Sequence, residues 1–303
     1  MESGACGMRK IGALEAGGTK MVLAVYLEDG TELERITLPT ESPEETMPPM
    51  IDFFRRHQVD ALGVGSFGPL QLHPDAPDYG SITSTPKLKW KDYPLLRNLL
   101  DGMAIPAKID TDVNAAALAE VELGAARGCS NAVYVTIGTG IGGGVYADGR
   151  LLHGLVHPEL GHMLLRPHPE DPNPRGVCPY HESCLEGLAA GPAIGARVQG
   201  DARDLPDDHP TFVIEAHYLA QMCVNLILTL SPEKIILGGG VLAREGLLPM
   251  VRRETLRLLG GYVQSPVITE RIDEYIVAPE LFPVSGLVGS YLLGKQALEE
   301  AGK

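Results

Sequence analysis

The chain has 303 residues, of which 44% are hydrophobic and 21% are charged, so it is long enough for two compact domains that each bury a core. Its 25 Lys and Arg residues are outnumbered by 39 Asp and Glu residues, and the net charge of −14 argues against a general nucleic-acid binder, which needs a basic face. No apolar run reaches the ~18 residues of a membrane span, so we expect a cytoplasmic protein with neither membrane nor nucleic-acid partners.

The N-terminus and the cysteines support the same expectation. The first ten residues lack the apolar stretch of a signal peptide, and Met8 is an alternative start that would make residues 1–7 an extension. Five cysteines are an odd number, and four of them follow no regular spacing, which argues against a disulfide framework. These four are Cys6, Cys129, Cys178 and Cys223.

The N-terminal part predicts a strand, a glycine loop, a second strand, a hairpin turn and a third strand. The strands are expected at 11–15, 21–26 and 34–38, around Gly17-Gly18-Thr19 and the turn Asp29-Gly30. Ser42-Pro43-Glu44-Glu45 is a capping box with proline at the first helical position, and it predicts a helix that runs to His57. A further strand is expected at 62–65.

The same arrangement recurs in the middle of the chain. Strands are expected at 132–137 and 144–146, around a glycine loop at 138–143 and before a second Asp-Gly turn at 148–149. We interpret this recurrence as an internal duplication. Between the two copies, Asn114 is expected to cap a helix over 115–127 that stops at Gly128.

The C-terminal half predicts an apolar helix at 211–230, a buried strand at 234–237 that runs into Gly238-Gly239-Gly240, and a closing helix at 287–301. The closing helix is expected to pack back on the first lobe. Residues 167–183 form an irregular insertion that is rich in Pro, His and Cys.

The two glycine loops predict phosphate sites, because glycine lets backbone N–H groups turn sharply and approach an anion. Gly138, Gly140 and Gly143 satisfy G-x-G-x-x-G, but a strand follows where a dinucleotide site needs a helix, and no Walker motif occurs. For either loop alone, a tight hairpin without a ligand is the alternative.

Asp112 is expected just before a helix N-terminus, where the helix dipole favours its ionised form. Such a carboxylate can accept a proton from a substrate hydroxyl at neutral pH. The alternatives are an ordinary N-terminal helix acid for Asp112 and a plain N-cap for Asn114.

Cys178, His181 and Cys184 have the C-x-x-H-x-x-C spacing of a tetrahedral zinc site. His162 can supply the fourth ligand, in competition with His157 and His168. The alternative is a surface loop with an unbonded cysteine pair.

Two acids flank these predicted metal ligands. Glu159 lies three residues before His162 and Glu186 two residues after Cys184, and carboxylates gathered there suit the hydroxyls of a sugar. The polar loops at 66–69 and 84–87 are further candidates for substrate binding. Solvated surface acids and routine turns are the alternatives.

The segments LEAGGTK, GSFGP, TDVNAAALAE, TIGTGIGGG, PELGH and ILGGGV, together with the Cys/His knuckle, closely resemble the ROK family of sugar kinases. The resemblance covers the chain from residue 9. It implies an α/β, duplicated, actin-like and ribonuclease H-like ATPase fold with two lobes and a central cleft. The lobes would be 1–112, with 287–303 packing back, and 113–286, with the zinc knuckle at 162–184.

Three departures from the family's glucokinase pattern resemble its zinc-containing bacterial fructokinase branch. They are Glu15 in place of Asp, Thr111 in place of Asn, and a knuckle with a histidine in place of a third cysteine. The expected reaction is therefore ATP-dependent phosphorylation of D-fructose to fructose 6-phosphate. Mannose, glucose and N-acetylated amino sugars are the alternative substrates, and a non-catalytic sugar sensor is a further alternative, although the helix-turn-helix of the family's repressors is missing.

The resemblance implies a role for each matching residue. Asp112 would be the catalytic base, with Mg²⁺ neutralising charge, Zn²⁺ in a structural role and a homodimer as the assembly. The expected zinc ligands are His162, Cys178, His181 and Cys184. The expected sugar-binding residues are Gly68, Pro69, Thr85, Thr111, Asn114, Glu159, His162 and Glu186. The expected ATP-binding residues are Gly17, Gly18, Thr19, Lys20, Thr136, Gly138, Thr139, Gly140, Pro192, Gly238, Gly239 and Gly240.

Overall fold

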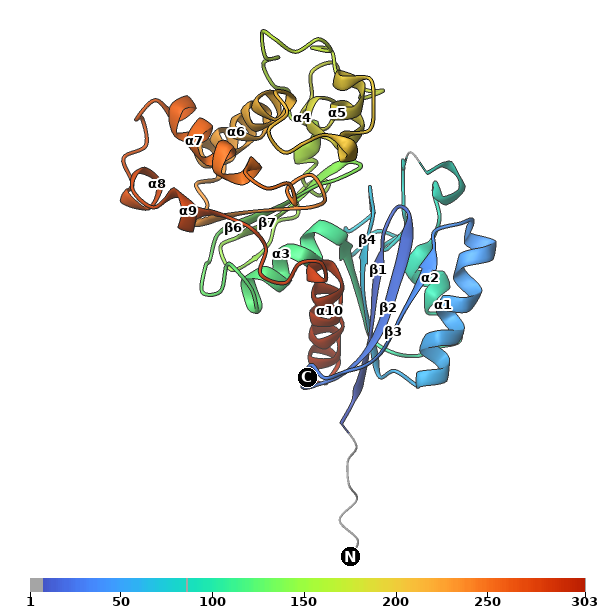
Figure 1. Ribbon diagram of the computed structural model, residues 1–303. Helices are drawn as coiled ribbons and strands as arrows, with labels where there is room; N and C mark the ends of the chain where they lie inside the picture. The colour runs from blue at the N-terminus through green and yellow to red at the C-terminus, as the bar shows by residue number, and fades with distance from the viewer. Residues whose placement is uncertain (1–7, 86, 303) are drawn as a thin grey trace, which may run out of the picture. The chain divides into compact units, whose positions relative to one another are not determined.

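The computed structural model describes residues 8–85 and 87–302, which divide into two compact units (Figure 1). The first unit holds the chain up to Ala119, the short segment His153–His157 and the residues from Pro283 onward. The second unit holds residues 120–152 and 158–282. Cys6 and the expected extension at 1–7 lie outside the described residues.

The first unit is built on a five-stranded sheet in the order β3-β2-β1-β4-β5. Strands β1, β2 and β3 pair antiparallel, whereas β4 runs parallel to both β1 and β5. The strands are β1 Lys10–Ala16, β2 Lys20–Leu27, β3 Glu32–Pro39, β4 Ala61–Ser66 and β5 Ala107–Thr111.

Helices cover both faces of this sheet. In Figure 1, α1 (Pro43–His57) and α2 (Leu95–Leu99) lie on one side, and α10 (Ser285–Ala301) lies on the other, against β1, β4 and β5. The expected capping box of α1 is present. A Cβ on Gly63 would lie 1.8 Å from the carbonyl oxygen of Ser290, so only glycine lets α10 approach β4 this closely. A short 3-10 turn, η1 (Leu88–Trp90), completes the unit.

The second unit repeats this topology. Its sheet has the order β10-β9-β6-β7-β8, with β6, β7 and β8 antiparallel and β9 parallel to both β6 and β10. The strands are β6 Ala132–Ile137, β7 Ile141–Ala147, β8 Arg150–Leu151, β9 Lys234–Gly238 and β10 Ile276–Val277. Because β8-β7-β6-β9-β10 matches β3-β2-β1-β4-β5 strand for strand, the predicted internal duplication is confirmed.

The helical layer of the second unit is centred on α6 (Thr211–Leu230), at the bounds that the sequence predicts, packed against α7 (Leu247–Leu259). By length and composition alone α6 is apolar enough to cross a membrane, but half of its apolar window is buried within the protein, as in a core helix. The remaining elements are η2 Leu160–His162, α4 Leu185–Ala189, α5 Gly191–Val198, η3 Ala202–Asp204, α8 Pro266–Thr269 and α9 Ile272–Tyr275.

The helix after β5 differs from the prediction at both ends. Helix α3 spans Asp112–Glu122, so Asn114 lies inside it and is not the N-cap. The Thr111 hydroxyl accepts the backbone N–H of Asn114 (3.1 Å) and takes the capping role. At the other end, the buried Glu120 carboxylate accepts the N–H of Ala125 (2.9 Å), and the chain turns before it reaches Gly128.

The second glycine loop is shorter than predicted, because β7 begins at Ile141 instead of Gly144. Gly143 pairs with Val135 in the sheet, and a Cβ there would lie 1.9 Å from the Leu160 side chain. The residue is therefore a packing glycine that lets η2 approach the sheet, and the loop itself is Gly138–Gly140.

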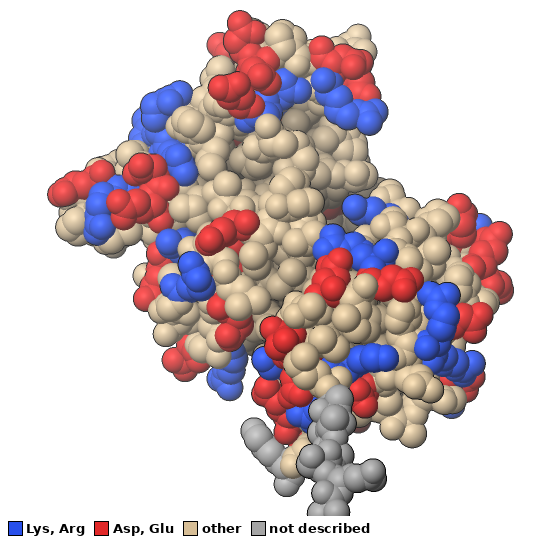
Figure 2. Space-filling model, turned by 60° about the horizontal axis from the view of Figure 1, so that its bottom comes forward, with Lys and Arg blue, Asp and Glu red and all other residues tan. Residues whose placement is uncertain are grey.

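Charged side chains are spread over the surface. On the face in Figure 2, Lys and Arg side chains are interspersed with Asp and Glu side chains. Some form short ion pairs, such as Arg9 with Glu28 and Arg35 with Glu32, both at 2.5 Å. Exposed pairs of this kind contribute little to stability.

Candidate active site

Several predicted site residues of the first unit follow the parallel strands of its sheet. The loop 17–20 follows β1, Gly68 and Pro69 follow β4, and Asp112 follows β5. Because β1, β4 and β5 are parallel, their carboxyl ends share one edge of the sheet, where open α/β sheets bind ligands. The first unit thus brings the predicted base, one glycine loop and one predicted sugar loop to the same edge.

Asp112, the first residue of α3, is a carboxylate with a perturbed pKa. Its burial raises the pKa to about 6, although a hydrogen bond from the Val113 N–H (2.9 Å) favours the ionised form. With a pKa of about 6, the carboxylate is mostly ionised at pH 7. This pKa is also close enough to neutral pH for the carboxylate to accept a proton, as a general base must.

Glu15, near the end of β1, is a second carboxylate of this kind. Burial and, as a smaller effect, the negative charge of Asp112 together raise its pKa to about 7, while Lys20, Arg35 and the Leu287 N–H act in the opposite direction. The sequence marks Glu15 only as a departure from the family pattern, since its burial depends on elements far away in the chain. Two neighbouring carboxylates with raised pKa values are typical of functional sites.

The first glycine loop is a tight, accessible turn. The Gly17 N–H donates to the Lys20 carbonyl (2.9 Å), and a Cβ on Gly17 would lie 2.8 Å from that oxygen, so the turn requires glycine. Thr40 fixes the loop through its hydroxyl, which donates to the Gly17 carbonyl (2.8 Å). Gly18 is half-buried, whereas Thr19 and Lys20 are exposed.

The loop after β4 is held by groups from two other segments. The Pro69 carbonyl accepts the Thr83 backbone N–H (2.8 Å) and the Thr83 hydroxyl (3.1 Å). The buried His157 accepts the Leu70 N–H at Nε2 (3.0 Å), and its ring lies 3.2 Å from where a Cβ on Gly68 would be. His157, one of the competing metal ligands, therefore holds this loop instead.

Asn114 and Thr111 belong to a buried network around Asp110. Asp110 Oδ1 accepts the Thr111 N–H (2.8 Å) and the Asn114 amide (2.7 Å), and Oδ2 lies 2.8 Å from His153 Nε2. Asn114 Oδ1 is buried and has no hydrogen-bond partner among the described residues. Thr85, the remaining predicted sugar residue of this unit, is also buried. The sequence pattern does not single out Asp110, although this residue directly precedes the TDVN segment.

In the second unit, Glu186 and the second glycine loop come together. Glu186 Oε2 accepts the Ile141 N–H (2.9 Å) and lies 2.7 Å from where a Cβ on Gly140 would be. The Gly138 carbonyl accepts the Gly191 N–H (2.8 Å), so the start of α5 fixes the other side of the loop. Pro192 follows in α5 and is exposed.

The third glycine segment lies against the same part of the second sheet. Gly239 has φ +92°, and a Cβ there would lie 2.3 Å from the Ile137 carbonyl oxygen, next to Gly138. Gly238 ends β9 and Gly240 is exposed. Thr136 lies half-buried in β6, and Thr139 is exposed on the loop. All the predicted ATP residues of this unit except Pro192 thus lie in β6, β9 or the loops that follow them.

Four predicted metal ligands meet in one cluster. The ligand atoms of His162, Cys178, His181 and Cys184 all lie within 4.8 Å of one another. Cys178 Sγ is 3.9 Å from His162 Nδ1 and 3.8 Å from His181 Nδ1, and Cys184 Sγ is 3.8 Å from His162 Nδ1. Sulfur and nitrogen ligands of tetrahedral zinc lie roughly 3.6 Å apart, so this donor set fits Zn²⁺. The backbone N–H of the competing His168 is bonded to the Tyr218 hydroxyl, and His168 lies outside the cluster.

The metal cluster and the predicted sugar acids share short elements. Cys184 is the N-cap of α4, whose first turn carries Glu186. His162 ends η2, whose N-cap is Glu159. Closing the cluster therefore fixes the backbone that carries both acids.

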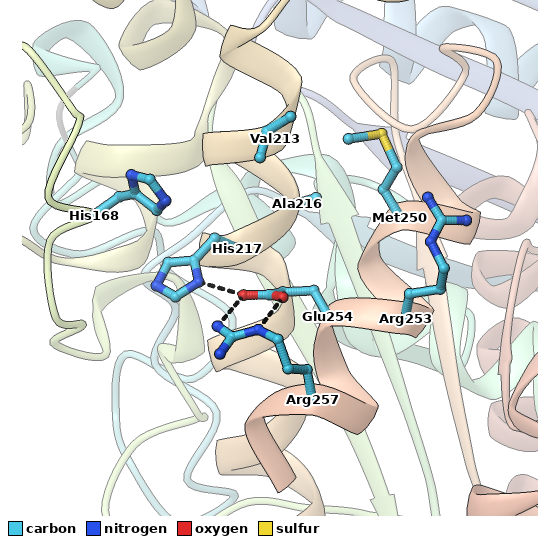
Figure 3. Close-up of a pocket in the computed structure, with 8 residues that line it drawn as sticks. All are labelled: His168, Val213, Ala216, His217, Met250, Arg253, Glu254 and Arg257. Carbon is cyan, nitrogen blue, oxygen red and sulfur yellow. Dashed lines mark hydrogen bonds and ion pairs between the residues drawn. The ribbon is translucent and has the colours of Figure 1, made fainter. Parts of the chain in front are cut away.

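A cavity of about 420 Å³ lies elsewhere, between α6, α7 and His168 (Figure 3). Glu254 bridges His217 (2.6 Å) and Arg257 (2.6 Å) at this cavity, and hydrogen bonds from these groups hold the pKa of Glu254 at about 2. Apart from the competing metal ligand His168, none of the predicted site residues lines it.

Comparisons with known proteins agree with these features. The model of the ROK family matches residues 11–297. A putative fructokinase of Bacillus subtilis is 45% identical over 95% of this chain and 96% of its own length. A fructokinase of Pediococcus pentosaceus is 46% identical over 96% of this chain and 99% of its own length. Among solved structures, a ROK hexokinase from Thermus thermophilus superposes with a TM-score of 0.76 at 29% identity, covering 96% of this chain and 99% of the hexokinase.

A ROK family glucokinase from Streptomyces griseus, solved with glucose and AMPPNP, has a TM-score of 0.74 at 24% identity over 96% of this chain and 100% of its own. The expected actin-like and ribonuclease H-like fold is confirmed by these neighbours. The match of the family model over nearly the whole chain, with two relatives above 40% identity, establishes that this chain belongs to the ROK family.

Proposed function

We propose that this chain is an ATP-dependent fructokinase that phosphorylates D-fructose at its 6-hydroxyl. The observation that carries the proposal is Asp112, a partly buried carboxylate at the carboxyl edge of a parallel sheet, with a pKa of about 6. The choice of fructose is supported by relatives above 40% identity that are named fructokinase or putative fructokinase.

In this mechanism Asp112 accepts the proton of the attacking hydroxyl as its oxygen bonds to the terminal phosphorus of ATP. The bond from that phosphorus to the bridging oxygen breaks, and ADP leaves with the electron pair. Phosphoryl transfer depends mainly on positioning and charge stabilisation, so the tight turns at Gly17–Lys20 and Gly138–Gly140 suit phosphate binding. Mg²⁺ would neutralise charge on the phosphates.

The sugar and the nucleotide would be held by different groups. Glu159, His162 and Glu186 would orient the sugar hydroxyls together with Gly68, Pro69, Thr85, Thr111 and Asn114. The buried, unpartnered Asn114 Oδ1 supports a role as an acceptor for a hydroxyl group. The adenine would lie near Gly238–Gly240 and Pro192.

We assign the Cys/His cluster to structural Zn²⁺. Two thiolates and two imidazoles fill all four positions of a tetrahedral ion, which leaves none for a reacting water. A cytoplasmic location is expected from the composition and the cysteine usage, and a homodimer is what the family resemblance implies.

A coupled ADP-release assay over fructose, mannose, glucose and N-acetylated amino sugars tests the proposal. We expect fructose to give the highest kcat/KM. The highest kcat/KM with another hexose would identify a different sugar kinase of this family. Sugar binding without ATP consumption would identify a sensor.

A further inference from the structure

Lys87 places a positive charge over the first glycine loop. A Cβ built on Gly18 would lie 2.7 Å from Lys87 Cε and 3.4 Å from its Nζ. The end of the lysine side chain therefore lies directly on the glycine, and a larger residue at position 18 would displace it.

The backbone of Lys87 is fixed from both sides. Its N–H donates to the hydroxyl of the buried Thr85 (3.3 Å), and its carbonyl accepts the N–H of Trp90 (2.8 Å). Trp90 is almost completely buried, and its indole N–H donates to the Glu41 carbonyl (2.7 Å). The lysine thus extends from a turn that is anchored in the core of the first unit.

The ammonium group of Lys87 has no counter-ion in the part of the chain that the structure describes. Within residues 8–85 and 87–302 it forms neither an ion pair nor a hydrogen bond, although the residue is half-buried. Lys108 of the same unit shows the usual arrangement, with its Nζ 2.5 Å from a Glu300 carboxylate oxygen. The ammonium at the end of this anchored side chain is therefore available to an anionic ligand.

We infer that Lys87 is a further catalytic residue, whose ammonium binds the terminal phosphoryl group of ATP as it is transferred. This inference rests on the proposed function, which places phosphate at the Gly17–Lys20 turn. A lysine held against such a turn stabilises the charge that spreads over the transferring oxygens.

The test compares K87Q, K87M and K87R with K89Q, a control that removes an exposed lysine two residues away. We expect kcat to fall roughly 100-fold or more in K87Q and K87M, with the KM for fructose changed less than about threefold. K87R retains most activity because it keeps the charge, and K89Q behaves like the wild type. Thermal unfolding shows which variants are folded. If K87Q does not fold, K87M takes its place in the comparison, because it preserves the aliphatic part of the lysine side chain.

Calorimetric titration provides a readout that does not depend on turnover. Loss of the Lys87 charge is expected to weaken binding of MgATP at least tenfold while the affinity for AMP stays constant. An unchanged MgATP affinity together with an unchanged kcat would overturn the inference. So would a K87Q effect confined to the KM for fructose, which would make Lys87 a sugar ligand. If the wild type turns over no hexose, the proposed function fails, but the titrations still decide whether Lys87 binds the terminal phosphate.

Discussion

His157 Nε2 accepts a hydrogen bond from the backbone N–H of Leu70, 87 residues earlier in the chain, at 3.0 Å in a buried position. The contact holds the loop that carries Gly68 and Pro69, two of the proposed sugar-binding residues. Nε2 must be unprotonated to accept this bond, so the histidine acts as an acceptor and positions the loop.

Replacing His157 should therefore affect sugar binding more than turnover. We expect H157A to raise the KM for fructose about tenfold, because the N–H of Leu70 loses its acceptor and the loop its orientation. H157Q restores much of the affinity, since its amide oxygen can accept the same bond. Steady-state kinetics of both variants decide the matter, and equal KM values for H157A and the wild type would refute the positioning role.

Removal of the Asp112 carboxylate should abolish most turnover. In D112N we expect kcat to fall by at least roughly 1,000-fold, because the hydroxyl has no base to accept its proton. Fructose binding, measured by calorimetry, should persist within a few-fold. Near-wild-type turnover would rule out Asp112 as the base.

The pH dependence of the wild type follows from the same group. Asp112 must be ionised to accept a proton, and burial raises its pKa to about 6. We therefore expect kcat/KM to fall as the pH drops below about 6, by up to tenfold per unit. An acid limb near pH 4, the ordinary range of an exposed Asp, would show that Asp112 is not the controlling group.

Glu215 should make the protein less stable as the pH rises. It is completely buried beside Arg197, and desolvation raises its pKa to about 8 despite that positive neighbour. Between pH 4.5 and 8 the folded state keeps a proton that the unfolded chain loses, so the free energy of unfolding falls by up to about 1.4 kcal/mol per pH unit. Urea unfolding at pH 5.5 and 7.5 should show a smaller difference for E215Q than for the wild type. Identical pH dependence in the two proteins would contradict this account.

Glu120 should contribute strongly to stability. Its buried carboxylate accepts backbone N–H groups of Ala125, Glu280 and Leu281 at 2.9–3.0 Å. E120A leaves these donors without the carboxylate, and we expect it to cost about 3 kcal/mol or more. E122Q, at an exposed position two residues away, serves as the matched control and should cost less than about 0.5 kcal/mol. Comparable losses in the two variants, measured by urea unfolding, would argue against the role of Glu120.

Metal analysis tests the Cys/His cluster. Protein purified without a metal-affinity tag is expected to hold about one zinc per chain, and C184S to hold much less, because it removes one of the four ligands. C223S is a suitable control, since Cys223 is buried in α6 outside the cluster. Zinc-free wild-type protein with undiminished thermal stability would exclude a structural zinc site.

Local patterns determined which parts of the fold could be predicted. Apolar periodicity located α6, and the two glycine loops with their Asp-Gly turns revealed the duplication, because both signals arise within short stretches of sequence. The end of α3 was not predictable in this way, since Glu120 and distant backbone groups terminate it.

The candidate site likewise has parts that local sequence patterns predicted and parts that they did not. Spacing predicted the four ligands of the Cys/His cluster, but the raised pKa of Glu15 depends on burial by α10, which lies more than 250 residues later. The positions of Lys87 over Gly18 and of His157 against Leu70 likewise depend on tertiary contacts, which no local pattern encodes.

The central claim, that this chain transfers phosphate from ATP to fructose, is tested most directly by fructose-dependent ADP release in the wild type and D112N side by side. We predict saturable ADP release with fructose as the preferred hexose in the wild type, and none above background in D112N. Absence of hexose-dependent ADP release from folded wild-type protein would contradict the claim.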